Sequence, residues 1–184
     1  LESPNPFSVE LGQDLEINLG DQAVLSPYYS ISPDSVSWFA DGLIDCAVNC
    51  ESVTYYPSVS GMVSMEANSA QGCLSSDTIQ VSVNEARKVF IPNAFSPNGD
   101  GYNDHFLLFG DVPNVQGVEE FIVFDRWGAV VFYKKNGQIN DPDSGWDGYL
   151  NGKLSQPGVY VYMARIRFLD DVVKTYTGDL TLNR

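Results

Sequence analysis

Apolar and polar residues alternate with a period of two along much of the chain, and this alternation predicts β-strands. In the first half the clearest runs are residues 15–19, 62–67 and 79–83, in which every second side chain is apolar. Turn sequences such as Asp41-Gly42 and Gln71-Gly72 separate the strands. No stretch keeps a helical period over three turns, so we expect an all-β chain.

The second half repeats this alternation with a heavier aromatic content. We expect its strands at residues 88–91, 106–109, 121–125, 129–133, 159–164 and 175–182. The turn Arg126-Trp127-Gly128 joins two of them into a hairpin, with Gly128 at the position that needs an unusual φ. Short strands at this spacing are typical of sandwiches. The predicted fold is therefore two tandem immunoglobulin-like β-sandwich domains.

The distribution of charge marks a boundary between the two halves. The chain has 184 residues, with 10 Lys and Arg against 24 Asp and Glu, for a net charge of −14. Residues 1–86 contain twelve of the acids and no Lys or Arg (−12), whereas residues 87–184 contain twelve acids and all ten bases (−2). We therefore predict one domain at 1–86 and a second at 87–184.

The same acidity bears on the partners of the chain. Nucleic-acid backbones and anionic lipids would both be repelled, so no nucleic acid is expected as a partner. The apolar runs are only a few residues long, too short to cross a bilayer, and no direct membrane insertion is expected. Because the sequence begins at Leu1 without a starting Met, we expect it to be a mature piece of a longer chain.

All three cysteines, Cys46, Cys50 and Cys73, lie in the first half. An odd number leaves two interpretations, one disulfide with a free thiol or three buried thiols. We favour one disulfide, which indicates an oxidising compartment. Because the four-residue step from Cys46 to Cys50 would close a small, strained ring, Cys73 is the preferred partner in that disulfide. Zinc is not expected, since the one histidine, His105, lies in the other half.

Residues 98–104 form a loop rich in Asn, Asp and Gly. Oxygen ligands at alternate positions, with glycines between them, suit a hard cation such as Ca²⁺. The predicted ligands of a structural Ca²⁺ are the side chains of Asn98, Asp100 and Asp104 and the carbonyl of Tyr102. The alternative is a pair of Asx and glycine turns that need no ion.

Two turns combine a tryptophan with polar residues and glycine. Their residues are Arg126, Trp127, Gly128, Trp146, Asp147 and Gly148. We interpret them as structural, with each tryptophan packed at the domain edge and Asp147 capping a turn. The alternative is an aromatic platform for sugar that Tyr160 and Tyr162 would extend.

Catalytic motifs are missing from the sequence. There is no Gly-x-Ser-x-Gly elbow, no phosphate loop and no metalloprotease helix. His105 beside Asp104 could act as a base, but a lone histidine at a strand start is more often a surface residue. The paired carboxylates lie mostly in loops, with no visible apolar pocket to shift their pKa values. We therefore do not expect an enzyme.

Several ordered motifs run through the second half: VFIPNAFSPNGDG at 89–101, FDRWG at 124–128, GWDG at 145–148, PGVYVY at 157–162 and GDLTL at 178–182. With them, residues 87–184 resemble the gliding-motility-associated C-terminal domain of Bacteroidetes surface proteins, also called the type B C-terminal domain of type IX secretion substrates. Residues 1–86 resemble the immunoglobulin-like or PKD-like module that often precedes it, on the basis of Trp38, the Cys46 and Cys50 pair, and residues 72–83.

The resemblance implies a delivery address rather than a reaction. Such domains are read at the outer membrane by the type IX secretion machinery, with PorP/SprF-like outer-membrane proteins as partners, and they carry an attached protein to the cell surface or beyond. Residues 1–86 would be a spacer. We expect recognition to use the last hairpin, because a chain terminus leaves strand polar groups available for pairing. Its candidate recognition residues are Tyr160, Tyr162, Tyr176, Gly178, Leu180 and Leu182.

A second hypothesis is a carbohydrate-binding or adhesive β-sandwich module of an extracellular adhesin or hydrolase, which would use the exposed aromatic residues. Both hypotheses place the chain outside the cell, secreted or on its surface.

Overall fold

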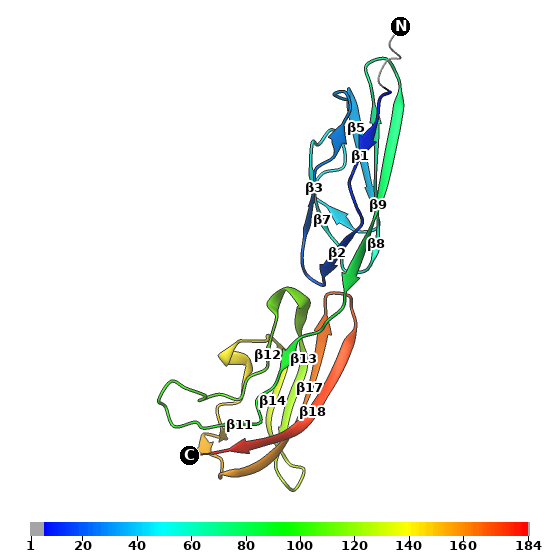
Figure 1. The fold of residues 1–184 in the computed structure, drawn as a ribbon. Helices are drawn as coiled ribbons and strands as arrows, with labels where there is room; N and C mark the ends of the chain where they lie inside the picture. The colour runs from blue at the N-terminus through cyan, green and yellow to red at the C-terminus, as the bar shows by residue number, and fades with distance from the viewer. Residues whose placement is uncertain (1–5, 184) are drawn as a thin grey trace. The chain divides into compact units, whose positions relative to one another are not determined.

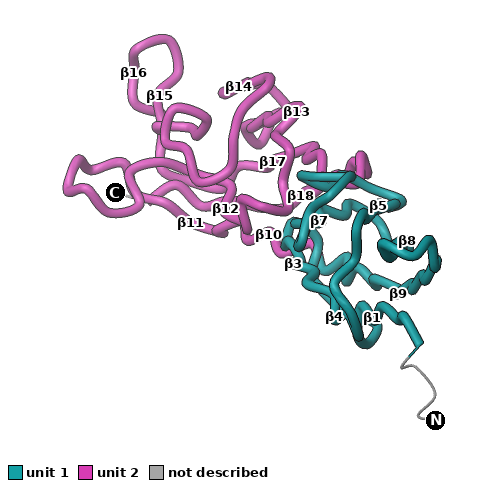
Figure 2. Tube along the Cα trace, turned by 90° about the horizontal axis from the view of Figure 1, so that it is seen from above, with its two compact units in different colours: residues 1–86 teal, residues 87–184 magenta. Residues whose placement is uncertain are grey.

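A computed structural model describes residues 6–183 of the chain. The chain divides into two compact units, Leu1–Ala86 and Arg87–Arg184 (Figure 2). The described residues are all-β, as the alternation predicts, apart from two single-turn 3-10 helices (Figure 1). Among residues 6–183 no helix is long and apolar enough to cross a membrane.

The first unit is a β-sandwich. A four-stranded sheet, in the order β2-β9-β8-β5, packs on a three-stranded sheet, β3-β7-β6, and β1 and β4 form a separate ribbon. The strands are β1 (Val9–Glu10), β2 (Leu15–Asn18), β3 (Ala23–Leu25), β4 (Tyr28–Tyr29), β5 (Ser35–Ala40), β6 (Leu43–Ile44), β7 (Val53–Tyr56), β8 (Gly61–Asn68) and β9 (Leu74–Asn84).

The alternation in sequence becomes the burial pattern of this sandwich. On β8 the side chains of Val63, Met65 and Ala67 are buried, and the residues between them face solvent or are half-buried. Trp38, which pairs with Met65 across β5 and β8, lies in the same core. Its indole N–H donates to the carbonyl of Cys50 at 3.1 Å, so the ring also fixes the loop between β6 and β7.

The disulfide joins Cys46 to Cys50, and the preference for Cys73 as a partner was wrong. Cys73 is a free, exposed thiol in the β8–β9 turn. The small ring closes because the loop folds back on β5, where the N–H of Trp38 donates to the carbonyl of Ala47 and the N–H of Asn49 donates to the carbonyl of Val36. Asn49 adopts a positive φ of 56°, which brings the two cysteine Cα atoms to 6.3 Å, within the range that a disulfide spans.

The second unit is built on a five-stranded sheet in the order β11-β18-β17-β13-β14, in which β11 runs parallel to β18. Short ribbons, β10 with β12 and β15 with β16, and the connecting loops supply the rest. The elements are β10 (Val89–Phe90), β11 (Ala94–Phe95), β12 (Phe109–Gly110), η1 (Val112–Asn114), β13 (Val115–Phe124), β14 (Val130–Gly137), η2 (Pro142–Ser144), β15 (Tyr149–Leu150), β16 (Lys153–Leu154), β17 (Gly158–Phe168) and β18 (Val173–Leu182).

Aromatic side chains fill the core of this unit. The Phe106 ring lies 5.4 Å from both Phe121 and Tyr162, and the Trp146 ring lies 5.0 Å from Tyr160, measured between ring centroids. Phe106 and Trp146 also exchange two backbone hydrogen bonds, at 2.8 and 3.1 Å. The strand predicted at 106–109 is reduced to this isolated bridge and the start of β12, because its partner is a loop rather than a sheet edge.

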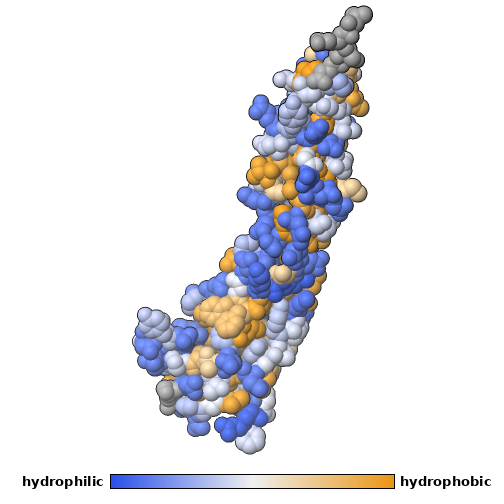
Figure 3. Space-filling view, in the orientation of Figure 1, coloured by the Kyte–Doolittle hydropathy of each residue, from blue (hydrophilic) through white to orange (hydrophobic). Residues whose placement is uncertain are grey.

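Hydrophilic side chains cover most of the face shown in Figure 3, and the hydrophobic ones form separate patches. Single exposed apolar residues are normal on a soluble surface.

Candidate functional site

The last hairpin, β17 with β18, does not present the side chains predicted to recognise a partner. Tyr160, Tyr162, Leu180 and Leu182 are buried, because alternate residues of both strands face the aromatic core. Their side chains therefore hold the domain together and cannot contact a partner in the folded state. Recognition through the last hairpin therefore stays a prediction, and it would have to use the backbone polar groups of the strands.

The other two predicted residues, Gly178 and Tyr176, are half-buried on β18. Gly178 pairs with Tyr162 across the hairpin, and a Cβ at position 178 would lie 2.8 Å from the phenolic oxygen of Tyr162. The glycine is thus required for the packing of the tyrosine ring. This contact gives Gly178 a structural role.

The free backbone edge of β18 is not at the chain terminus. Near that end, the N–H of Thr181 donates to the carbonyl of Asn93 at 2.8 Å and that of Asn183 to Phe95 at 2.9 Å, so β11 covers residues 181–183. No other strand within residues 6–183 pairs with this edge between residues 173 and 180. Any strand pairing with a partner would therefore use the first part of β18.

The loop at 98–104 is closed by hydrogen bonds from backbone N–H groups. The carboxylate of Asp104 accepts from Asn98, Gly99 and Gly101 at 3.0, 2.7 and 2.8 Å. The carboxylate of Asp100 accepts from the N–H of Tyr102 at 2.8 Å and from the side-chain amide of Asn98 at 2.9 Å. The contacts from Tyr102 to Asp100 and from the N–H of Asp100 to the side-chain oxygen of Asn98 are those of Asx turns, whereas Asp104 closes the loop by accepting from residues that precede it.

The protonation of Asp104 follows from these contacts. The N–H groups of Gly99 and Gly101 lower the pKa of its carboxyl below the ordinary value. No group of three or more His, Cys, Asp or Glu that could hold a metal exists among residues 6–183. The arrangement of donors favours the turn interpretation, and the Ca²⁺ site stays a prediction that a chelator can test.

The turn at Trp146-Asp147-Gly148 is structural. Trp146 is completely buried, and its indole N–H donates to the carbonyl of Tyr149 at 3.0 Å. The carboxylate of Asp147 accepts from the N–H of Tyr149 at 2.9 Å. Gly148 has a φ of 79°, and a Cβ there would lie 2.7 Å from the side chain of Pro97. Trp146 and Gly148 thus serve the packing of the core, and the exposed Asp147 caps the turn, as the sequence predicts.

The turn at Arg126-Trp127-Gly128 is different, because its tryptophan faces solvent. Trp127 is 86% exposed, so the expectation that it packs at the domain edge was wrong. The turn itself is well fixed: the Asp125 carboxylate accepts from the N–H groups of Trp127 and Ala129 at 2.8 and 2.9 Å. Gly128, at a φ of 83°, supplies the predicted left-handed conformation.

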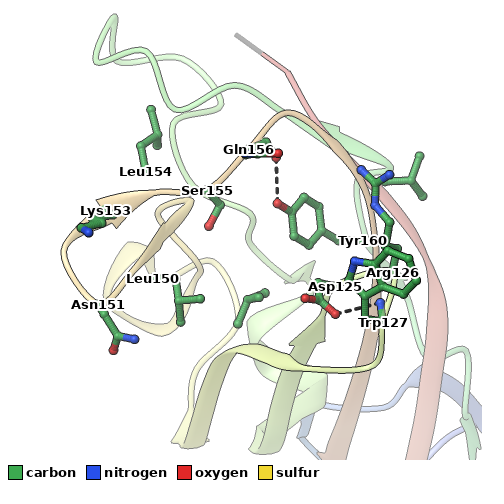
Figure 4. Close-up of a pocket in the computed structure, with 12 residues that line it drawn as sticks. Asp125, Arg126, Trp127, Leu150, Asn151, Lys153, Leu154, Ser155, Gln156 and Tyr160 are labelled. Carbon is green, nitrogen blue, oxygen red and sulfur yellow. Dashed lines mark hydrogen bonds between the residues drawn. The ribbon is translucent and has the colours of Figure 1, made fainter.

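A groove of about 640 Å³ lies beside this turn. Figure 4 shows the Asp125–Trp127 turn on one side, side chains of the β15–β16 hairpin on the other, and Tyr160 between them. The hydroxyl of Tyr160 donates to the carbonyl of Gln156 at 2.7 Å. The lining residues are Asp125, Arg126, Trp127, Val131, Leu150, Asn151, Lys153, Leu154, Ser155, Gln156, Val159 and Tyr160.

The β15–β16 hairpin, which forms one side of the groove, was not predicted from the sequence. Two strands of two residues each are too short to show alternation, although Asn151-Gly152 is a strong two-residue hairpin turn. The structure places both residues at positive φ, 51° and 74°, as such a turn requires. That dipeptide is the one signal that could have located the hairpin.

Comparison with known proteins connects this second unit to a family. Residues 89–182 match the family model CHU_C, described as a type IX secretion signal domain. No curated protein matches the chain in sequence.

Solved structures with some likeness include the D00-D0 domain of intimin, at 11% identity and TM-score 0.37 over 97% of this chain and 100% of that one. A second is SGBP-B of the Bacteroides ovatus mixed-linkage glucan utilization locus, in complex with a heptasaccharide, at 14% identity and TM-score 0.36 over 95% and 44%. A third is the structure of the eight N-terminal Ig domains of the Down syndrome cell adhesion molecule. It shares 13% sequence identity with this chain at a TM-score of 0.42, over 97% of this chain and 27% of that one. These scores, all below 0.5, do not define a common fold.

Proposed function

Since the chain belongs to the CHU_C family of type IX secretion signal domains, we propose that its second unit is the address that carries an attached polypeptide out of the cell and to its surface. Residues 1–86 then serve as a spacer between that address and the protein it delivers.

One observation carries the proposal. The family match, residues 89–182, coincides with the compact unit Arg87–Arg184. This unit has its own core, in which Phe106, Trp146 and Ile166 are fully buried. The coincidence supports a signal read as a folded surface rather than as a linear peptide.

The proposed partner is a PorP/SprF-like outer-membrane protein of the type IX machinery. The proposed role is non-catalytic, and the use of the acidic groups supports this. Among residues 6–183, the carboxyls of Asp45, Asp104 and Asp141 have a pKa below the ordinary value, and each owes the shift mainly to hydrogen bonds from Thr54, from Gly99 and Gly101, and from Ser144, respectively. These three carboxylates thus serve the fold.

The proposal can be tested by asking whether the second unit is needed for export. A reporter that folds in the periplasm would be fused ahead of residues 1–184, or ahead of residues 1–86 alone, in a host with a type IX system. We expect the longer fusion outside the cell and the shorter one to stay in the periplasm. Equal export of both fusions would contradict the proposal, as would retention of both when the longer one is folded.

A further inference from the structure

Trp127 has the two properties of a residue that anchors a complex. Its side chain is 86% exposed, the largest exposure among the large hydrophobic residues of the described chain. It stands on a turn whose backbone is already fixed by Asp125. Tryptophan is enriched among residues that dominate binding energy, and an ordered turn lowers the entropy lost when a partner binds.

The groove next to Trp127 offers an apolar surface to the same partner. Leu150 and Leu154 line it from the β15–β16 hairpin (Figure 4). Val159, on β17, belongs to the same lining and is 55% exposed. The hairpin is held by the tight turn at Asn151-Gly152. Both walls are therefore ordered without a ligand, as binding grooves usually are.

The charges in the groove point to the chemistry of that partner. The exposed cations Arg126 and Lys153 line it, and neither forms an ion pair with any of residues 6–183. The guanidinium of Arg126 is close to β17, with Nη2 3.3 Å from where a Cβ of Gly158 would lie. The carboxylate of Asp125 is occupied by its own turn. In a chain of net charge −14, this groove is a cationic site that complements an acidic ligand.

We propose that the groove around Trp127 binds an extended, acidic polypeptide segment of the protein that reads the secretion signal. This inference rests on the proposed function and adds to it the surface and the chemistry of recognition. The segment stacks an apolar side chain on the indole ring and places carboxylates beside Arg126 and Lys153.

A neutral sugar is the competing ligand, and the structure does not favour it. The sugar platform considered as the alternative in the sequence needs several exposed rings, but Trp146, Tyr160 and Tyr162 are buried. One indole remains, and a neutral sugar would leave the two cations without a counter-charge.

The test uses the full chain, 1–184, fused to the reporter, with two groove variants. Trp127→Ala removes the anchor, and the double variant Arg126→Glu with Lys153→Glu reverses the charge. We expect each to reduce export about tenfold or more, as loss of an anchoring residue does. The conservative pair Arg126→Lys with Lys153→Arg should keep most of the export.

Matched controls separate the groove from general effects. Tyr102→Ala removes another aromatic ring, 78% exposed, from a different loop. Lys88→Glu with Lys135→Glu changes the net charge by the same amount at exposed positions outside the groove. Both controls should export like the parent chain. Unchanged melting temperatures of all variants would show that folding is intact.

Full export of Trp127→Ala, or of the charge-reversed chain, would overturn the inference while leaving the proposed function standing. Retention of the folded parent fusion would instead contradict the proposed function, and the inference with it.

A third measurement addresses sugar binding. Trp127 is exposed whereas Trp38 and Trp146 are buried, so acrylamide quenching of tryptophan fluorescence reports on Trp127. Protection by a mixed-linkage glucan heptasaccharide would also overturn the inference, and no protection is expected.

Discussion

The Asp125 carboxylate holds the backbone N–H of Trp127 at 2.8 Å, so the most exposed tryptophan of the described chain stands on a fixed turn. The same oxygen accepts from Ala129 at 2.9 Å. Asp125→Ala leaves both N–H groups to water, and we expect the free energy of unfolding to fall by about 1 kcal/mol. Asp125→Asn keeps an acceptor oxygen and should lose less. Calorimetry of the two variants checks this, and equal losses would contradict it.

The contact between Gly178 and Tyr162 gives a second prediction. Because an added Cβ would lie 2.8 Å from the phenolic oxygen and 3.0 Å from ring carbons, Gly178→Ala should destabilise the unit by about 1–3 kcal/mol through overpacking. Gly117→Ala is the matched control, since its added Cβ would meet the nearest atom at 3.6 Å. Urea unfolding of both variants measures the difference. A Gly178→Ala chain as stable as the control would show that the ring moves aside freely.

The pH dependence of stability follows from two carboxyls with a lowered pKa, Asp104 in the loop at 98–104 and Asp141 at the start of η2. The N–H groups of Gly99 and Gly101 hold the pKa of Asp104 below its ordinary value of 3.8, and the Ser144 hydroxyl does the same for Asp141. A carboxyl with a lowered pKa in the folded state stabilises fully above its unfolded pKa and loses that effect as the pH falls through the folded pKa. We expect the melting temperature to drop as the pH falls below the ordinary carboxyl pKa of 3.8. The drop should be smaller in Asp104→Asn, which lacks this carboxyl. Parallel curves for the two proteins would contradict the assignment.

The calcium question has a direct test. Because the Asp104 carboxylate and the Asp100 carboxylate already accept N–H groups, we expect the chain to melt at the same temperature in millimolar Ca²⁺ and in chelator. A bound structural ion would instead add about 2.7 kcal/mol at one hundred times its Kd. A lower melting temperature in chelator would instead support the predicted calcium site.

The sequence predicted the parts of the fold that depend on local pattern. Alternation located β8, β9, β17 and β18, because one face of each of these strands is buried. The step in charge after Ala86 falls where the structure divides the chain into two units.

What the sequence could not predict depends on long-range packing. Trp127 and Trp146 each lie next to a turn glycine in the sequence, yet Trp127 is 86% exposed and Trp146 is fully buried. The difference arises because Trp146 pairs with Phe106, forty residues away in the chain, whereas Trp127 lies at the tip of a hairpin. The burial of Tyr160 and Leu180 likewise depends on which face of the hairpin the core covers.

We propose that the folded second unit is by itself the secretion signal. The most direct measurement is export of a reporter fused to residues 87–184 alone, in a host with a type IX system, with circular dichroism of the purified fusion to show that its β-structure is intact. We expect this fusion to reach the outside of the cell as efficiently as the fusion to residues 1–184. A folded fusion that stays in the periplasm would contradict it.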